Sequence, residues 1–274
     1  MIDEAEMLER AVLENIYGAA PAAVADALGI RPRVIAGAFV GLAAALPASG
    51  IVLNRAIGLG VAAPATENGA RELVAAYADA GVSRYFVHLH PHASPPELAA
   101  WLSDAGLVRA RGWQKFERPP EPLATPPTDL AVRAVGREHG GDFARIACNA
   151  FDLGDAAVPW LAELPGRPGW HVFMSFAGDV PAGTGAIFVQ DGLAWFDFGT
   201  TAPEFRQRGS QGALLARRIG HAIELGCRKL LTCTGEAVPG DPQHSYRNLL
   251  KAGFRETYAR ANYAPPRIPQ AAAH

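Results

Sequence analysis

Apolar residues in the first hundred positions recur at spacings that predict short helices and strands. Leu8, Val12 and Ile16 share one face of a helix over 4–16, and acidic residues lie on the opposite face. The same patterns predict further helices over 22–28, 67–80 and 95–105, and strands over 51–57, 85–89 and 113–116. A weakly alternating, Gly-rich stretch covers 34–45.

A proline-rich segment follows this half of the chain. Five of the eleven residues from Pro119 to Asp129 are prolines, a composition typical of a stiff, extended linker. We therefore predict a domain over 1–118, a linker over 119–129, a second domain over 130–265 and a frayed tail over 266–274.

The second half alternates more regularly. An Asp191-Gly192 turn between apolar runs indicates a β-hairpin. Strands are predicted over 131–135, 170–176, 183–189, 193–199, 229–234 and 254–263, and helices over 140–151, 158–164, 210–226 and 245–252. The order β-α-α-β-β-β-α-β-α-β predicts an α/β (mixed α+β) sheet.

One stretch of the second half carries recognisable chemistry. The strand that ends near Phe198 runs into a basic, Gly-bearing turn from Arg206 to Gly212, and a helix follows. The free N–H groups and the dipole at a helix start favour an anion. Arg206 and Arg208 add positive charge, and Gly209 and Gly212 permit close backbone approach. This pattern predicts a phosphate site; the alternative is a basic turn that opens an ordinary surface helix.

The segment from Arg206 to Gln211 (Arg-Gln-Arg-Gly-Ser-Gln) resembles the Arg/Gln-x-x-Gly-x-Gly/Ala signature of the GNAT superfamily of N-acyltransferases. Gln211 departs from it, although Gly212 and Ala213 follow at once. A second likeness lies in 245–254, where Ser245 and the Gly-Phe end of a helix match. Pro242 stands where the family often has Asn.

The resemblance implies a GNAT fold and an acetyl-CoA-dependent N-acetyltransferase, in which an amine attacks the thioester directly. The acceptor would be a small-molecule amine or a protein amine. The resemblance also implies a set of cofactor-binding positions: Gly199, Thr200, Thr201, Arg206, Gln207, Arg208, Gly209, Ser210, Gln211, Gly212, Ala213, Ser245 and Asn248.

The proton-transfer groups are less clearly marked. Asp197, just before the expected thioester site, is the candidate base, as some family members use an acid in this region; the alternative is an exposed strand acid or one that pairs with an arginine. Glu236 and His244 are weaker candidates. The family's usual Tyr before Gly-Phe is replaced by Leu249, and three tyrosines could substitute for it: Tyr246, Tyr258 and Tyr263. A CoA-binding protein without turnover is therefore the alternative function.

The two halves share an internal repeat. Residues 81–88 resemble 226–233, and the Trp101–Leu107 and Leu249–Phe254 segments are alike. We predict that the first half is a degenerate GNAT copy that braces the second, the alternative being an unrelated α/β domain. Its loop over 63–70 lacks a preceding arginine and carries Glu67, which would repel a pyrophosphate.

Composition and charge limit the partners, metals and cellular compartment that we expect for this protein. The chain of 274 residues is 49% hydrophobic, and its net charge of −2 gives no general attraction to nucleic acid or anionic membranes. Its three cysteines lack metal spacing, and the histidines at 88, 90 and 92 read as packed or solvated, so no metal is predicted. No secretory segment follows the acidic N-terminus. We therefore expect a cytoplasmic protein; the sequence does not indicate its oligomeric state.

Overall fold

The computed structural model describes residues 3–267 and confirms the predicted helices of the first half, with small shifts at their ends. They are α1 (Glu4–Tyr17), α2 (Ala22–Leu28), α3 (Glu67–Asp79) and α4 (Leu98–Asp104). The strands are β1 (Arg33–Ile35), β2 (Ala38–Val40), β3 (Arg55–Ile57), β4 (Phe86–Leu89) and β5 (Val108–Arg118).

Two strand predictions in this half need correction. The strand expected over 51–57 is only β3, because a 3₁₀ turn (Gly50–Val52) and Asn54 precede it. The Asn54 side chain accepts from the Ala43 N–H at 2.8 Å and donates to the Ala43 carbonyl at 3.1 Å. These side-chain bonds hold the segment in place of the backbone pairing of a strand. By contrast, β5 is much longer than 113–116, because it pairs along both of its edges.

The second half has the predicted order of elements. Its strands are β6 (Ala131–Val135), β7 (Trp170–Ala177), β8 (Val180–Gln190), β9 (Leu193–Thr201), β10 (Lys229–Gly235) and β11 (Arg255–Ala264). Its helices are α5 (Gly140–Ala150), α6 (Val158–Leu161), α7 (Ser210–Glu224) and α8 (His244–Lys251). Residues 119–130 form neither helix nor strand and lead from β5 to β6. The domain limits stay a prediction, and the predicted tail lies outside the described residues from 268 onward.

All eleven strands join one mixed sheet in the order β1-β2-β3-β4-β11-β5-β10-β9-β8-β7-β6. Two stretches of this sheet share a topology: β2-β3-α3-β4-α4-β5 and β8-β9-α7-β10-α8-β11. In each, the first two strands are antiparallel and the next pair is parallel. The chain is therefore built from two copies of one unit, as predicted; within residues 3–118, the first copy has no counterpart of β6.

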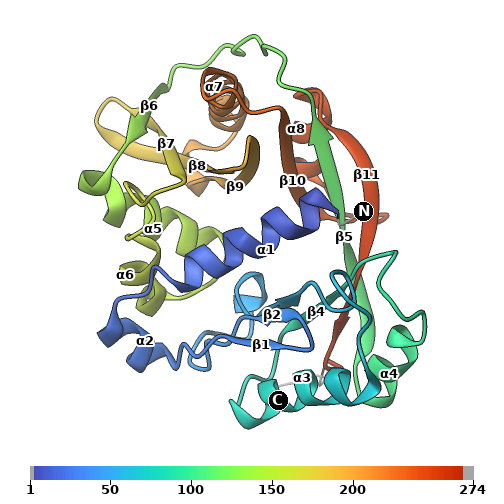
Figure 1. The fold of residues 1–274 in the computed structure, drawn as a ribbon. Helices are drawn as coiled ribbons and strands as arrows, with labels where there is room; N and C mark the ends of the chain where they lie inside the picture. The colour runs from blue at the N-terminus through green and yellow to red at the C-terminus, as the bar shows by residue number, and fades with distance from the viewer. Residues whose placement is uncertain (1–2, 268–274) are drawn as a thin grey trace.

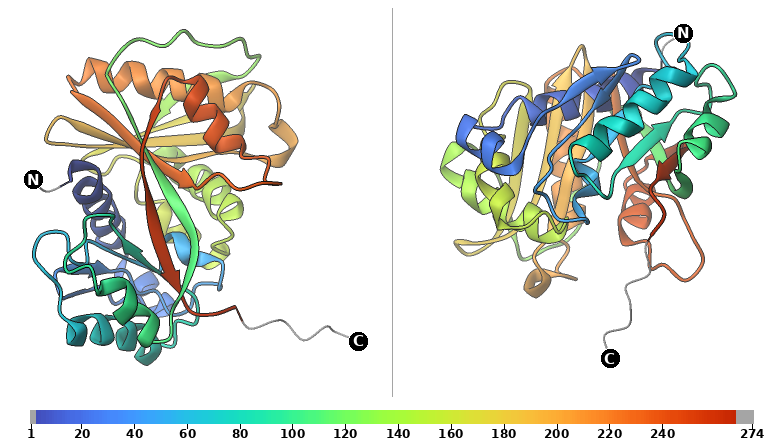
Figure 2. Two further views of the ribbon diagram at one scale, coloured as in Figure 1. Left: turned by 90° about the vertical axis from the view of Figure 1, so that its right-hand side faces the viewer. Right: turned by 90° about the horizontal axis from the view of Figure 1, so that it is seen from below.

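The last strands of the two copies are exchanged. β5 pairs with β10 of the second copy, β11 pairs with β4 of the first, and β5 and β11 pair with each other. Figure 2 shows these two long strands side by side across both parts of the molecule. The exchange makes the sheet continuous. It also places β5, a strand of the first copy, next to β10, which pairs in parallel with β9 in the second copy.

Helix α1 crosses the middle of the molecule, between the two copies (Figure 1). It begins at Asp3, whose carboxylate accepts the Glu6 N–H at 2.8 Å. Its inner face carries two acids into a buried charge cluster, which we define as Glu6, Glu9, Arg55, Lys115 and Arg260. These five side chains come from α1, β3, β5 and β11.

Glu9 is the centre of this cluster, with ion pairs to Arg55, to Lys115 and, at 2.7 Å, to Arg260. Burial alone would raise the pKa of Glu9, but the three cations hold it well below its ordinary value of 4.5. Removal of any partner would leave an uncompensated charge in the interior. The cluster therefore fixes α1 onto strands from both copies.

Candidate active site

The second copy opens a gap between two neighbouring strands. β9 and β10 pair in parallel only from Leu193 and Lys229 to Trp195 and Leu231. Beyond this, β9 continues along β8 to its end, while β10 continues along β5. Because each strand follows a different neighbour, their backbone pairing ends at Trp195 and Leu231. We call the unpaired stretch beyond these residues the gap, and it lies where the resemblance expects the thioester.

A bulge in β9 lies at the start of this gap. Phe198 has a left-handed φ of 49°, and the pairing with β8 shifts register between Thr184–Thr200 and Ala186–Asp197. The Phe198 N–H donates to the Asp197 carboxylate at 2.7 Å. Gly199 is exposed directly after the bulge, and β9 continues along β8 to Thr201.

Arg218 supports the bulge from the face of the sheet that α7 covers. This buried α7 side chain donates to the carbonyls of Leu214, Ala186 and Asp197 at 3.1–3.3 Å, and desolvation lowers its pKa to about 10. A Cβ at Gly185 would lie 2.7 Å from its guanidinium. Arg218 is not among the residues predicted from the sequence, although its position four residues after Leu214, on the apolar face of α7, marks it as an inward-facing charge.

The turn after β9 leads into an unusual helix start. Gly209, with φ of 81°, is the N-cap of α7 and supplies no side-chain cap. The Ala213 N–H makes the first backbone bond of the helix, to the Gly209 carbonyl at 3.1 Å. The N–H groups of Ser210, Gln211 and Gly212 therefore have no helical acceptor, which is the arrangement that binds anions.

The two arginines of the turn differ in their surroundings. Arg206 is exposed, and among residues 3–267 no hydrogen bond or ion pair involves its guanidinium. Arg208 instead pairs with Asp129 of the linker, its Nε lying 3.2 Å from both carboxylate oxygens. Only Arg206 is thus available to an incoming anion.

The first turn of α7 is fastened to the sheet by its side chains. Gln211 Nε2 donates to the Thr200 carbonyl at 2.7 Å and lies 3.1 Å from the Thr201 hydroxyl. Ser210 is buried, with its hydroxyl 2.8 Å from that of Ser175, and Ala213 is buried as well. At Ser210 and Ala213, therefore, only the backbone faces a ligand.

Helix α8 holds the remaining predicted cofactor residues. Ser245 is exposed in its first turn and Asn248 is half-buried. Within the described part of the chain, no hydrogen bond joins this helix to the turn 206–209. The structure thus gathers the predicted positions of β9, the turn and α7 into one site, with Ser245 and Asn248 on a separate element.

Asp197 lies beside the bulge, on the strand that borders the gap. Its second carboxylate oxygen accepts from Trp195 Nε1 at 3.2 Å, and burial raises its pKa above the ordinary 3.8. Glu236 instead accepts the Gly112 N–H at 3.2 Å, beside β5, and His244 is exposed at the start of α8. Of the three candidates, only Asp197 lies on β9 beside the bulge, and its role as a base stays a prediction.

The tyrosines that could replace Leu249 have other partners. Leu249 is buried in the core between α7 and α8. The Tyr246 hydroxyl donates to Glu256 at 2.5 Å, and burial raises its pKa to about 12. Tyr258 donates to Asp3 at 3.1 Å, and Tyr263 packs in the core of the first copy.

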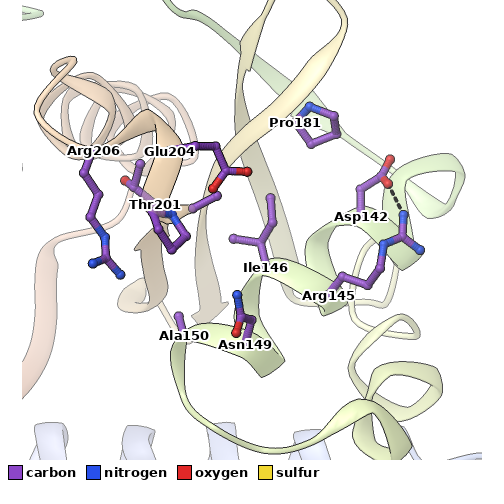
Figure 3. A pocket seen from close by; sticks show the side chains of 11 residues that line it. Asp142, Arg145, Ile146, Asn149, Ala150, Pro181, Thr201, Glu204 and Arg206 are labelled. Atoms are coloured by element: carbon purple, nitrogen blue, oxygen red, sulfur yellow. Dashed lines mark hydrogen bonds and ion pairs between the residues drawn. The ribbon is translucent and has the colours of Figure 1, made fainter.

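A cavity of about 450 Å³ adjoins the turn 206–209, which we call the phosphate turn after its predicted ligand (Figure 3). Residues from α5 form one side of it, and residues from the end of β9 through Arg206 form the other. Ile146 and Asn149 project from α5, while Thr201 and Arg206 lie opposite. A ligand on the turn would have room beside it here.

The equivalent place in the first copy is closed. The Thr66 hydroxyl caps α3 by accepting the Gly69 N–H at 3.0 Å, and Glu67 adds a negative charge in the first turn. The Ser94 N–H donates to the Gly60 carbonyl and the Ser94 carbonyl accepts the Ala65 N–H, both at 2.8 Å. These bonds hold Ser94 against the loop that follows β3. One N–H group of the α3 start is thus capped by a side chain, whereas α7 has no such cap.

The three histidines of the first half lie in two settings. His88 is buried, with Nδ1 2.6 Å from Asn262 Oδ1 and its ring against Trp113. His90 Nδ1 accepts the N–H of His92 at 3.1 Å. Within residues 3–267, no three metal-ligating side chains cluster, and no helix could span a membrane.

Comparison with solved structures shows that this arrangement of strands and helices is the GNAT fold. The solved structures that share it include the following three. A GCN5-related N-acetyltransferase from Kribbella flavida aligns over 98% of both chains with a TM-score of 0.64 and 17% identity. A tandem GNAT protein from the clavulanic acid biosynthesis pathway covers 85% of this chain and 78% of its own (TM-score 0.56, 15% identity). A GCN5-related N-acetyltransferase from Sphaerobacter thermophilus covers 74% and 67% (TM-score 0.55, 14% identity).

No protein-family model matches the sequence, and no curated protein matches it. The likeness therefore lies in the structure, and it shows that this chain has the GNAT fold in two copies.

Proposed function

We propose that the second copy is an acetyl-CoA-dependent N-acetyltransferase and that the first copy binds no CoA. The observation that carries this proposal is the contrast between two equivalent helices. The start of α7 is uncapped and follows a basic turn, whereas Thr66 and Glu67 close the start of α3. Only the former suits the pyrophosphate of a CoA thioester.

Each part of the site then has a role. The N–H groups of Ser210, Gln211 and Gly212, together with Arg206, hold the pyrophosphate. The main chain of residues 199–201 orients the pantetheine arm and supplies an N–H donor for the developing oxyanion. The bound thioester supplies the activated acyl group. Asp197 accepts the proton that the attacking amine must lose.

The acceptor is an amine, either a small molecule or an exposed protein amine. The cavity between α5 and the phosphate turn is the space through which it would approach, since it adjoins Thr201 at the end of β9. Its charged lining residues include both signs: Asp142, Arg145, Glu204 and Arg206. We further propose that the protein works in the cytoplasm.

A CoA-binding protein without turnover is the second candidate. One observation favours it: Leu249 is buried in the core, and the neighbouring tyrosines bond elsewhere. Neither Tyr246 nor Tyr258 is therefore held ready to protonate a departing thiolate.

Calorimetric titration with acetyl-CoA and with free CoA tests the cofactor site. Arg206→Ala should weaken binding about tenfold or more, because a charge-assisted hydrogen bond to phosphate is lost. The matched control is Arg71→Ala, which removes an exposed arginine from the corresponding helix of the first copy and should change nothing. Absence of binding by the unaltered protein would remove both candidate functions.

Release of free thiol in the presence of amines separates the two candidates. Thiol release that requires an amine supports the transferase. Tight binding with no release across a broad panel of small amines and peptides would favour the non-catalytic protein.

A further inference from the structure

The linker between the two copies lies directly on the phosphate turn. It arches over α7 on its way from β5 to β6 (Figure 1). A Cβ at Gly209 would lie 2.7 Å from the Pro127 carbonyl oxygen, and one at Gly212 would lie 2.7 Å from Pro126 Cγ. In this chain, therefore, both glycines are required by the linker, in addition to any use for a cofactor.

Two linker side chains reach the same residue of the turn. The Thr128 hydroxyl donates to the Arg208 carbonyl at 2.6 Å and accepts the Leu130 N–H at 3.1 Å. The Asp129 carboxylate accepts from both Nε and Nη2 of Arg208. We call these three residues, Thr128, Asp129 and Arg208, the linker clamp. It fixes Arg208 by its backbone and by its side chain at once.

The turn needs such a restraint because its backbone is strained. Gln207, immediately before Arg208, has φ of 64°, a left-handed conformation that a residue with a Cβ adopts at a cost. Gly209 follows with φ of 81°. Strained conformations persist only where the surroundings hold them, and the linker clamp lies against this segment.

The two arginines can therefore be assigned separate tasks. The planar fork of Arg208 is already matched to a carboxylate, which is the geometry it would also offer to a phosphate. Arg206, two residues earlier, lines the cavity without a partner among the described residues.

We propose that Thr128 and Asp129 are positioning residues. Through Arg208 they hold the turn in the conformation that binds the CoA pyrophosphate, while Arg206 is the arginine that contacts it. This inference rests on the proposed function of the second copy. It makes cofactor affinity depend on the linker that joins the two copies.

A charge exchange tests the linker clamp in the full-length protein. The variants are Asp129→Arg, Arg208→Asp and the double variant, each titrated with acetyl-CoA by calorimetry. Each single change should raise the Kd about fivefold or more, since both leave like charges facing each other. The double variant should return to within about threefold of the unaltered protein, because the pair is rebuilt in reverse.

The opposite assignment gives a different result. If the Arg208 guanidinium contacts the pyrophosphate, the double variant will bind as weakly as Arg208→Asp, since it too presents a carboxylate to the phosphate. That result overturns the proposal, and so do single variants that bind like the unaltered protein. The control is Arg133→Asp on the edge strand β6. This change disrupts an exposed ion pair between Arg133 and Asp179 and should leave the Kd unchanged.

Hydrogen exchange of the amides at 207–210, measured without cofactor, tests the clamp independently of CoA. Exchange should speed up in Thr128→Val and in both single charge variants, and slow again in the double variant. Unchanged exchange overturns the inference while leaving the proposed function intact. Faster exchange together with no CoA binding by the unaltered protein would remove both the proposed function and the cofactor role of the clamp.

Discussion

At the scale of single residues, position in the sheet decides what an acid can do. Asp197 and Asp191 lie on the same hairpin, yet Asp191 is exposed in the turn, while Asp197 is held by Trp195 and the Phe198 amide. Burial raises the pKa of Asp197, which makes its carboxylate a stronger proton acceptor.

Asp197→Asn should therefore lower the turnover number about a hundredfold or more, with the acetyl-CoA Kd unchanged. Since the base acts when deprotonated, kcat/KM should fall as the pH drops through the raised pKa, so the acidic limb lies above 3.8. The measurement is a pH profile of thiol release, with Asp191→Asn as control. Unaltered turnover in Asp197→Asn would remove this residue from the mechanism.

At the scale of elements, equivalent helices differ at their ends and a single helix joins the two copies. α3 and α7 have the same place in the repeat, but only α3 carries a side-chain cap. α1 brings Glu6 and Glu9 to three cations from three different strands. Its stability contribution is thus electrostatic as well as apolar.

Glu9→Gln should destabilise the protein by about 3–5 kcal/mol, because buried cations lose their partner. Its folded pKa is depressed, so its contribution is present above about pH 4.5 and is lost as the pH falls toward the folded value. Urea unfolding at pH 7 and below pH 4.5 measures both effects. Glu14→Gln, on the exposed side of the same helix, is the matched control; equal losses in the two variants would contradict this account.

At the scale of the whole molecule, the exchanged strands make each copy depend on the other. β10 has β5 as one of its two neighbours, and β4 has β11. Neither half of the chain contains all the strands of its own part of the sheet.

A protease site inserted between Ala124 and Thr125, both exposed, tests this dependence. After cleavage, the fragments should co-elute in size-exclusion chromatography, because the ladders of β5 and β11 still connect them. They should separate only in denaturant. Separation in native buffer would show that the exchanged strands do not hold the copies together.

Local patterns were enough for most elements and for the phosphate turn. The hairpin at Asp191-Gly192 and the order of the second half follow from periodicity and turn chemistry, which act between neighbours in sequence. The strand expected over 51–57 failed because Asn54 bonds to Ala43, a contact no periodicity shows. β5 was predicted too short because the residues on either side of 113–116 are held in the strand by pairing with β10 and β11, which lie more than a hundred residues further along the chain.

The two-copy α/β architecture, the basic turn before α7 and Asp197 as a candidate base could be predicted from the amino-acid sequence, because each shows in short stretches of neighbouring residues. The folded structure was needed to establish which strands pair across the copies, that Arg218 supports the bulge, and that Arg208 pairs with the linker while Arg206 does not. These depend on contacts such as that of Asp129 with Arg208, 79 residues apart. Side-chain type alone does not specify such partners, since an arginine fork fits a carboxylate and a phosphate equally well.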